Sequence, residues 1–316
     1  MLSVVHGIRY QEPFWLSILH GEVERKIMKK KAKIGTLGAL LVAVLSAGGY
    51  YMNGGDVANS GAAVNKAPTE MTIPVGDAAE TVPVGVNYSL PALRANSGEQ
   101  ILYKKAMTIS YNKQMRTPNW VAYQLLKADM DGTAGREREF YQDFDVEKKY
   151  RVSTYDYSRS GYDRGHMAPA GDFSGDSQAK KQTFYMTNVC PQNHTLNGDS
   201  WNTLEKQCRD WARREGGIYS VVGPIYTSSN PERIGTHKVA VPDKFSRCIL
   251  SLRKGHEKAI GFIYDNTSNR QRIAHAACSV DEVEKMTGLD FFTALPDKLE
   301  EKLESSYSLK DWGYSY

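Results

Sequence analysis

The chain has 316 residues, of which 41% are hydrophobic and 10% are aromatic. A chain of this length and composition can bury the core of one large domain, which excludes the class of disordered proteins. The formal net charge of +4 at pH 7 suits a polyanionic partner, but the same charge is common among proteins that have no such partner.

The N-terminal region predicts the location of the protein. Arg25, Lys26 and the lysine-rich stretch 29–33 precede an apolar run from Ile34 to Met52. Positive charge ahead of such a run predicts an export signal or a membrane anchor, with everything after Met52 on the outer side of the membrane. A buried core helix is the alternative. Whether the segment is cleaved or retained stays open.

Two further segments flank this run. Residues 1–27 fit poorly ahead of a signal, so we expect translation to begin at Met28 and residues 28–52 to form the signal or anchor. From 53 to 95 the chain is rich in Gly, Ala, Asn, Pro and Val and has no helical or alternating apolar pattern. This composition predicts a flexible spacer, followed by a folded domain over residues 96–316.

Within the folded domain, short β-rich runs alternate with a few helical ones. The predicted strands are Trp120–Leu126, Thr183–Val189, Ile218–Ile225, Phe245–Leu252 and Ala259–Tyr264. The predicted helices are Ser200–Glu215, which stops at Gly216, Ser279–Met286, which starts with a capping box, and Pro296–Glu304. Because strands and helices do not alternate strictly, the predicted fold class is α+β with an antiparallel or mixed sheet.

The first predicted helix has an apolar stripe at spacings of three and four residues, which must be buried. The stripe consists of Trp201, Leu204, Cys208 and Trp211. Glu205 and Arg209 lie beside it, and two interpretations stay open for them. They form a surface ion pair at i and i+4, or they stand at the edge of a metal site.

The four cysteines are Cys190, Cys208, Cys248 and Cys278, all beyond the spacer. An even number of cysteines on the oxidising side of a membrane favours disulfides. Pairing Cys190 with Cys208 and Cys248 with Cys278 would keep each bridge local, although sequence does not fix the pairing. A zinc site made by Cys190, His194 and Cys208 is the alternative, with a spacing that matches no familiar zinc pattern.

His166 is the strongest candidate for a general base, because imidazole titrates near neutral pH. An isolated histidine is more often structural than catalytic, so the interpretation depends on its surroundings. His166 stands in the segment 163–170, Asp-Arg-Gly-His-Met-Ala-Pro-Ala. An ordered series of polar and apolar residues follows it: Asn188, Pro191, Gln192, Leu196, Asn197, Trp201, Leu204, Glu205 and Arg209.

This series resembles the DNA/RNA non-specific endonuclease family, which has the ββα-metal nuclease fold. The shared features are the DRGH motif at 163–166, an Asn-Pro-Gln segment, a Leu-Asn pair, and a Leu-Glu pair with an arginine four residues later. Further similarities lie at 119–123, 222–225, 241–242, 279–289 and 295–297, so the resemblance covers residues 96–300. It implies a central, mostly antiparallel sheet flanked by helices.

The resemblance implies a role for each matching residue. His166 would be the general base, and Asn197 the sole direct protein ligand of a Mg²⁺ ion, with Mn²⁺ as a substitute ion. Mg²⁺ takes oxygen ligands and keeps several waters, which agrees with a single amide ligand. Glu205 and Asn188 would orient the waters of the metal or His166.

The implied phosphate contacts come from arginines. Arg164 and Arg209 would contact the phosphate or brace the site, and a further arginine upstream would be Arg138, with Arg136 as the alternative. Asp163 is expected to support the backbone or arginines of the motif rather than a metal, and His194 to be a loop histidine. Three tyrosines ahead of the motif either stack bases or simply pack: Tyr155, Tyr157 and Tyr162.

The implied activity is an exported endonuclease that hydrolyses DNA and RNA without sequence preference and leaves 5′-phosphate ends. Chemistry directed at the phosphate needs neither a particular base nor a 2′-hydroxyl group. Two alternatives are a non-catalytic nucleic-acid receptor at the cell surface and a specialised nuclease for DNA uptake. Residues 34–52 would hold the protein to a membrane if they are not cleaved, and the oligomeric state stays open.

Overall fold

The computed structural model describes residues 70–75, 78–83, 86–92, 98–135 and 137–314, all within the unit Val64–Tyr316. The predicted start at Met28 and the signal or anchor at 28–52 lie outside the described residues, as does the part of the predicted spacer before residue 70. Among the described residues, no helix is both long and apolar enough to cross a bilayer.

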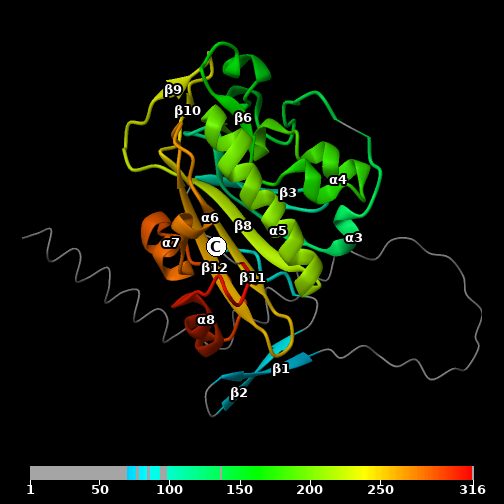
Figure 1. Ribbon diagram of the computed structural model, residues 1–316. Coiled ribbons are helices and arrows are strands. Elements are labelled where there is room, and N and C mark those ends of the chain that lie inside the picture. Colours follow the sequence, from blue (N-terminus) through cyan, green and yellow to red (C-terminus); the bar gives the residue numbers. More distant parts are fainter. Residues whose placement is uncertain (1–69, 76–77, 84–85, 93–97, 136, 315–316) are drawn as a thin grey trace, which may run out of the picture. The chain divides into compact units, whose positions relative to one another are not determined.

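A seven-stranded antiparallel sheet forms the centre of the fold (Figure 1), as the predicted α+β class requires. Its strands, in spatial order, are β13 (Ala277–Cys278), β12 (Lys258–Asp265), β11 (Lys244–Ser251), β8 (Ile218–Ile225), β5 (Thr117–Leu125), β4 (Thr108–Asn112) and β3 (Glu99–Tyr103). Four of the five predicted strands are found, as β5, β8, β11 and β12. The edge strands β3 and β13 and the inner strand β4 were not predicted.

Successive side chains on the central strands point to opposite faces of the sheet and belong to two separate hydrophobic cores, one on each face. On β5, Val121 and Tyr123 join the core beneath α5 (Asn202–Glu215), whereas Ala122 joins the core beneath α7 (Val280–Thr287) and α8 (Asp297–Glu304). Figure 1 shows α5 on one side of the sheet and α7 and α8 on the other. The sheet therefore separates the DRGH side of the molecule from the α7–α8 side.

The three predicted helices are present with small changes at their starts. The helix predicted at Ser200–Glu215 begins as a π-helical turn, Leu196–Trp201, and continues as α5. The four residues of its predicted apolar stripe are all 0% exposed. Gly216 ends α5 with a φ of 83°, a left-handed conformation that glycine adopts without strain. Ser279 and Glu282 form the predicted capping box at the start of α7.

The remaining elements are short. They are β1 (Glu70–Val75), β2 (Ala78–Pro83), α3 (Lys127–Met130), η2 (Lys148–Tyr150), η3 (Thr154–Tyr157), β6 (Asp163–His166), η4 (Ala170–Phe173), α4 (Ser177–Gln182), η5 (Met186–Asn188), β7 (Val189–Gln192), β9 (Arg233–Ile234), β10 (Val239–Ala240) and α6 (Ile273–Ala276). The strand predicted at Thr183–Val189 is wrong: this segment follows α4 and contains a 3₁₀ turn before β7 begins.

A hairpin lies inside the segment predicted to be a structureless spacer. Strands β1 and β2 pair in antiparallel register, and Ile73 and Val82 are both 0% exposed within the α7–α8 core. The side chain of Lys302, on α8, donates a hydrogen bond to the carbonyl oxygen of Pro74 at 3.1 Å. The sequence does not reveal this hairpin, because Pro74 and Pro83 stand within its two strands and proline is uncommon in paired strands.

The four cysteines are free thiols, in disagreement with the two predicted disulfides. Cys248 on β11 and Cys278 on β13 both pair with Gly261 of β12, so a whole strand separates them. Two strand spacings amount to about 9.6 Å, whereas bridged cysteines have Cα atoms about 4.4–6.8 Å apart. Cys190 and Cys208 are both 0% exposed in the core beneath α5, and burial raises the pKa of each thiol.

Candidate active site

The DRGH motif forms strand β6, which pairs with β7 in an antiparallel ribbon. Gly165 lies opposite Cys190, and His166 lies opposite Val189. A Cβ atom on Gly165 would stand 2.2 Å from Oε1 of Gln192, a side chain that is itself 0% exposed. Only glycine therefore fits at this position, and the close approach fixes the ribbon that carries His166.

His166 lies between two aromatic rings and keeps an unpaired ring nitrogen. The ring centroids of Phe140 and Phe184 are 5.1 and 4.8 Å from that of the imidazole. Its Nε2 atom is buried and has no hydrogen-bond partner in the described part of the chain. Burial, assisted by the positive charge of Arg164, lowers the pKa of His166 to about 4. The imidazole is therefore neutral at neutral pH, as a proton acceptor must be.

Asn188 holds the backbone that follows His166. Its Oδ1 accepts a hydrogen bond from the backbone N–H of Ala168 at 3.0 Å, and its Nδ2 donates to the carbonyl oxygens of Ala168 and Thr183, each at 2.8 Å. The side chain is 0% exposed. Its amide is occupied by backbone groups, so it supports His166 through the chain rather than by touching the ring or a water.

Asn197 stands on the π-helical turn before α5, next to Asp163. The Nδ2 atom of Asn197 donates a hydrogen bond to Oδ2 of Asp163 at 3.0 Å, and the Nδ1 atom of His194 lies 2.9 Å from the same oxygen. Asp163 therefore orients Asn197, whereas we expected it to support the backbone or arginines of its own motif. The side chain of His194 is 86% exposed, in keeping with a loop histidine.

Two cavities meet at Phe140, which lines both. The first, of about 300 Å³, is lined by Asp163, Arg164 and Asn197 together with Tyr157, Ser158 and Tyr162. The second, of about 610 Å³, is lined by His166, Arg138 and Lys180 together with Glu137, Ala170, Gly171 and Phe184. His166, the expected base, and Asn197, the expected metal ligand, thus line two cavities that share Phe140, each with a cationic side chain in its wall.

The cationic side chains differ in their surroundings. Arg164 is exposed, donates to Oγ1 of Thr154 at 2.5 Å, and lies 4.9 Å from the centre of the Phe140 ring. Arg138 lines the cavity that contains His166, which favours it as the upstream arginine; Arg136 lies outside the described residues. Lys180, from α4, was not predicted.

Glu205 and Arg209 do not form the surface ion pair considered from the sequence. Arg209 donates instead to Asp172 at 2.9 Å, and Asp172 is 0% exposed. Burial raises the pKa of Glu205 to about 7, against the opposing effect of Arg247. The carboxyl group thus sits between its protonated and ionised forms near neutral pH. Asp172 was absent from the sequence-based prediction.

Arg247 is a second functional residue that sequence reasoning missed. It is 0% exposed, donates to the carbonyl oxygen of Met167 at 3.1 Å, and lies 5.4 Å from the centre of the Trp201 ring. It therefore links the residue after His166 to the start of α5. A signal was available, because Arg247 is the only charged residue of the predicted strand Phe245–Leu252, and a charged side chain buried in a strand needs a partner.

The three tyrosines ahead of the motif have different environments. Tyr155 is 81% exposed, and Tyr157 is 5% exposed. The hydroxyl group of Tyr162 donates to Glu232 at 2.9 Å. Tyr157 and Tyr162 line the first cavity, whereas Tyr155 is exposed and is not among its lining residues.

The donor set near Asn197 fits a hard cation that keeps its own water. The amide nitrogen of Asn197 donates its hydrogen bond to Asp163. The groups that could bind a cation here are therefore the amide oxygen of Asn197 and the neighbouring carboxylate. Oxygen donors of this kind suit Mg²⁺, which needs few protein ligands. Among the described residues, the only group of three His, Cys, Asp or Glu side chains that converge lies elsewhere, so Cys190, His194 and Cys208 form no zinc site.

Strands β6 and β7 followed by α5 form a ββα unit that carries His166 and lies next to Asn197, and this arrangement is that of the ββα-metal class of nucleases. The chain belongs to the DNA/RNA non-specific endonuclease family, whose sequence model matches residues 90–298.

Individual relatives agree with this assignment. The chain is 35% identical to the mitochondrial nuclease EXOG of Xenopus laevis over 202 residues, which cover 59% of this chain and 56% of that protein. It is 32% identical to nuclease C1 of Cunninghamella echinulata var. echinulata over 214 residues, covering 63% and 85% respectively. The structure is similar to a chain in the crystal structure of the EndoG/EndoGI complex, with a TM-score of 0.61, 30% identity, and coverage of 66% of this chain and 90% of that one.

Proposed function

We propose that this chain is an endonuclease that hydrolyses phosphodiester bonds of both DNA and RNA without sequence preference. The observation that carries the proposal is the unpaired, buried Nε2 atom of His166 in a cationic cavity. A buried nitrogen without a partner is costly in a structural histidine. It is useful in a base that must receive a proton.

In this proposal, His166 accepts a proton from a water molecule that attacks the phosphorus atom. Phe140 and Phe184 exclude bulk water from the imidazole and keep it neutral. Arg138, Arg164 and Lys180 bind the phosphate oxygens from the walls of the two cavities. Each of these contacts is made to the phosphate backbone of the nucleic acid, so neither a particular base nor a 2′-hydroxyl group is needed for binding.

Asn197 would hold the Mg²⁺ ion, or Mn²⁺ in its place. A bound Mg²⁺ ion supplies positive charge that stabilises the negative charge developing on the phosphate and on the leaving 3′ oxygen. Asp163 keeps Asn197 in position for this task. Cleavage at that bond leaves 5′-phosphate ends.

We also propose that the protein is exported, with the nuclease domain in the periplasm, outside the cell or on an outer membrane face. Support comes from the basic stretch before the apolar run at 34–52. Cell fractionation with detection of the full chain tests this proposal: recovery in the cytosol alone would contradict it.

The activity is tested with the purified full chain on supercoiled plasmid, single-stranded DNA and RNA, each with Mg²⁺ and with a chelator. We expect cleavage of all three substrates, complete loss with chelator, and products that a 5′-phosphate-dependent exonuclease degrades. His166→Ala should lower the rate at least about 10³-fold and retain binding. Binding by the wild type without cleavage would indicate a nucleic-acid receptor instead.

A further inference from the structure

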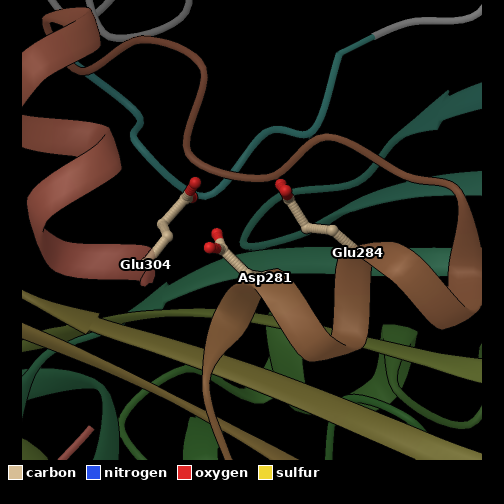
Figure 2. A group of neighbouring side chains, drawn as sticks. All are labelled: Asp281, Glu284 and Glu304. Carbon is tan, nitrogen blue, oxygen red and sulfur yellow. The ribbon is translucent and has the colours of Figure 1, made fainter. Parts of the chain in front are cut away.

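Three carboxylates converge between α7 and α8, on the face of the sheet opposite α5 (Figure 2). Asp281 and Glu284 come from α7, and Glu304 is the last residue of α8. One oxygen of each side chain lies within 4.8 Å of the other two. Asp281, Glu284 and Glu304 are called the carboxylate cluster below. The sheet separates the cluster from the DRGH side of the molecule, so the nuclease site does not use it.

Glu304 is the member that most needs a positive partner. Its residue is 4% exposed, and its Oε1 atom is buried without a hydrogen-bond partner. Figure 2 shows the Glu304 side chain extending from the end of α8 to the same space as the carboxyl groups of Asp281 and Glu284. A buried, unpaired carboxylate that faces two others is strongly unfavourable unless a cation or a proton lies between them.

The electrostatic surroundings agree with this geometry. Burial, followed by the negative charges of Glu284, Glu300, Asp281 and Asp290, raises the pKa of Glu304 to about 10. All of these neighbouring charges have the same sign. A proton or a metal ion at the buried Glu304 carboxyl group would offset this repulsion at neutral pH, and the two possibilities have different experimental signatures.

The cluster is arranged so that an ion can enter it from water. Asp281 is exposed, Glu284 is partly exposed, and Glu304 closes the inner end. The Oε1 atom of Glu284 accepts a hydrogen bond from the backbone N–H of Phe291 at 2.7 Å, which fixes its carboxyl group. An open outer end, one fixed ligand and one buried ligand together resemble a binding site more than a solvated acidic surface.

We propose that the carboxylate cluster binds one calcium ion, which fastens α7 to α8. The donors are all oxygen atoms, which excludes metals that prefer nitrogen or sulfur. Ca²⁺ accepts six to eight ligands in irregular geometry and completes its shell with water, whereas Mg²⁺ demands a nearly regular octahedron. The site is structural, because it lies away from His166 and Asn197.

The test measures thermal unfolding and calorimetric binding of calcium to the full chain. Asn197→Ala is the parent protein, so that metal at the nuclease site does not contribute. We expect one calcium ion to bind with a Kd of about 0.1–1 mM. At ten times this Kd, the unfolding temperature should rise by about 3 °C. Magnesium at the same concentration should give a smaller rise.

Two substitutions in that parent locate the ion. Glu304→Gln and Asp281→Asn keep the side-chain shape, remove one charge, and should each abolish the calcium-dependent rise. Asp281 is exposed, so the second variant folds even if the first does not. Glu301→Gln is the matched control: Glu301 is an exposed residue of α8 outside the cluster, and this variant should keep the full response.

The proposal is wrong if calcium leaves the unfolding temperature of the parent unchanged, or if both cluster variants keep the response of the parent. A parent that ignores calcium but is stabilised by Glu304→Gln holds a proton in the cluster, which also overturns the proposal.

Discussion

His166 combines two properties that an exposed histidine lacks. Its Nε2 atom has no hydrogen-bond partner among the residues that the structure describes, and its imidazole is flanked by Phe140 and Phe184. Burial destabilises the charged form, so the ring stays neutral to lower pH than usual. If His166 is the general base, this burial keeps the imidazole neutral but also makes it a weaker proton acceptor. The pH dependence of cleavage measures this effect.

The pKa of His166, lowered to about 4, predicts where the acid limb of the activity lies. Because only the neutral imidazole accepts a proton, kcat/KM should stay high as pH falls from 7 and decline as pH passes through about 4. Initial rates on plasmid DNA at fixed Mg²⁺, with circular dichroism to confirm that the protein is folded at each pH, measure this limb. A midpoint at pH 6.5 or above would contradict the enclosed environment of His166.

Glu205 predicts that the folded protein becomes less stable as pH rises toward and through 7. Burial raises its pKa in the folded protein to about 7, above the usual 4.5. Its contribution to stability is therefore fully present below pH 4.5 and is lost as pH rises through about 7. Relative to the wild type, Glu205→Gln should gain about 2–3 kcal/mol of unfolding free energy between pH 4.5 and pH 8.

Urea unfolding of both proteins at the two pH values measures this difference. Lys206→Gln, a change at the adjacent exposed position of α5, is the control and should show the same pH dependence as the wild type. An unfolding free energy that changes equally with pH in the wild type and in Glu205→Gln would show that the carboxyl group is not buried as described.

At the level of elements, the site depends on how β6, β7 and α5 are joined. The sequence predicted α5 and its buried stripe because a helix repeats its apolar residues every three to four positions. It failed at Thr183–Val189, whose apolar residues satisfied a strand pattern. Hydrogen bonds from Asn188 to Thr183 and Ala168 hold this segment in a turn, and such tertiary contacts leave no periodic signal in the sequence.

Removing this clamp should affect the position of His166 as well as stability. Asn188→Ala deletes three buried hydrogen bonds and leaves the N–H of Ala168 without its partner. We expect a loss of about 3 kcal/mol in unfolding free energy. We also expect a decrease in kcat larger than the change in KM, because the base is displaced while the cationic phosphate contacts remain.

Asn202→Ala is the matched control for this prediction. The side chain of Asn202 makes a single exposed hydrogen bond, at 3.3 Å, to the carbonyl oxygen of Gly198. This variant should lose less than about 0.5 kcal/mol. If Asn188→Ala and Asn202→Ala have equal effects on stability and kcat, the role assigned to Asn188 is wrong.

Across the whole molecule, the sequence predicted the local patterns better than the limits of the domain. The DRGH segment, Asn197 and Glu205 could be found because their order and spacing match a known family. Asp172 could not, since what matters in it is an ion pair with Arg209 from a distant segment. For Arg247 the sequence offered a charged residue inside a predicted strand, but it did not show that its partner is the carbonyl oxygen of Met167. The domain start at residue 96 was too late for the same reason, because only the fold shows that β1 and β2 complete the α7–α8 core.

The hairpin therefore predicts a separation between stability and catalysis. Ile73 is 0% exposed in the α7–α8 core, across the sheet from His166. Ile73→Ala should lower the unfolding free energy by about 2–4 kcal/mol, because a buried side chain is replaced by a cavity. At a temperature where both proteins are folded, kcat and KM should match the wild type.

Thr72→Ala, an exposed change in the same strand, should alter neither stability nor kinetics. Chemical unfolding and plasmid cleavage of the three proteins provide both measurements. Equal stability of Ile73→Ala and Thr72→Ala would show that the hairpin is not part of the domain core, and a loss of kcat in Ile73→Ala alone would show that the two faces of the sheet are not independent.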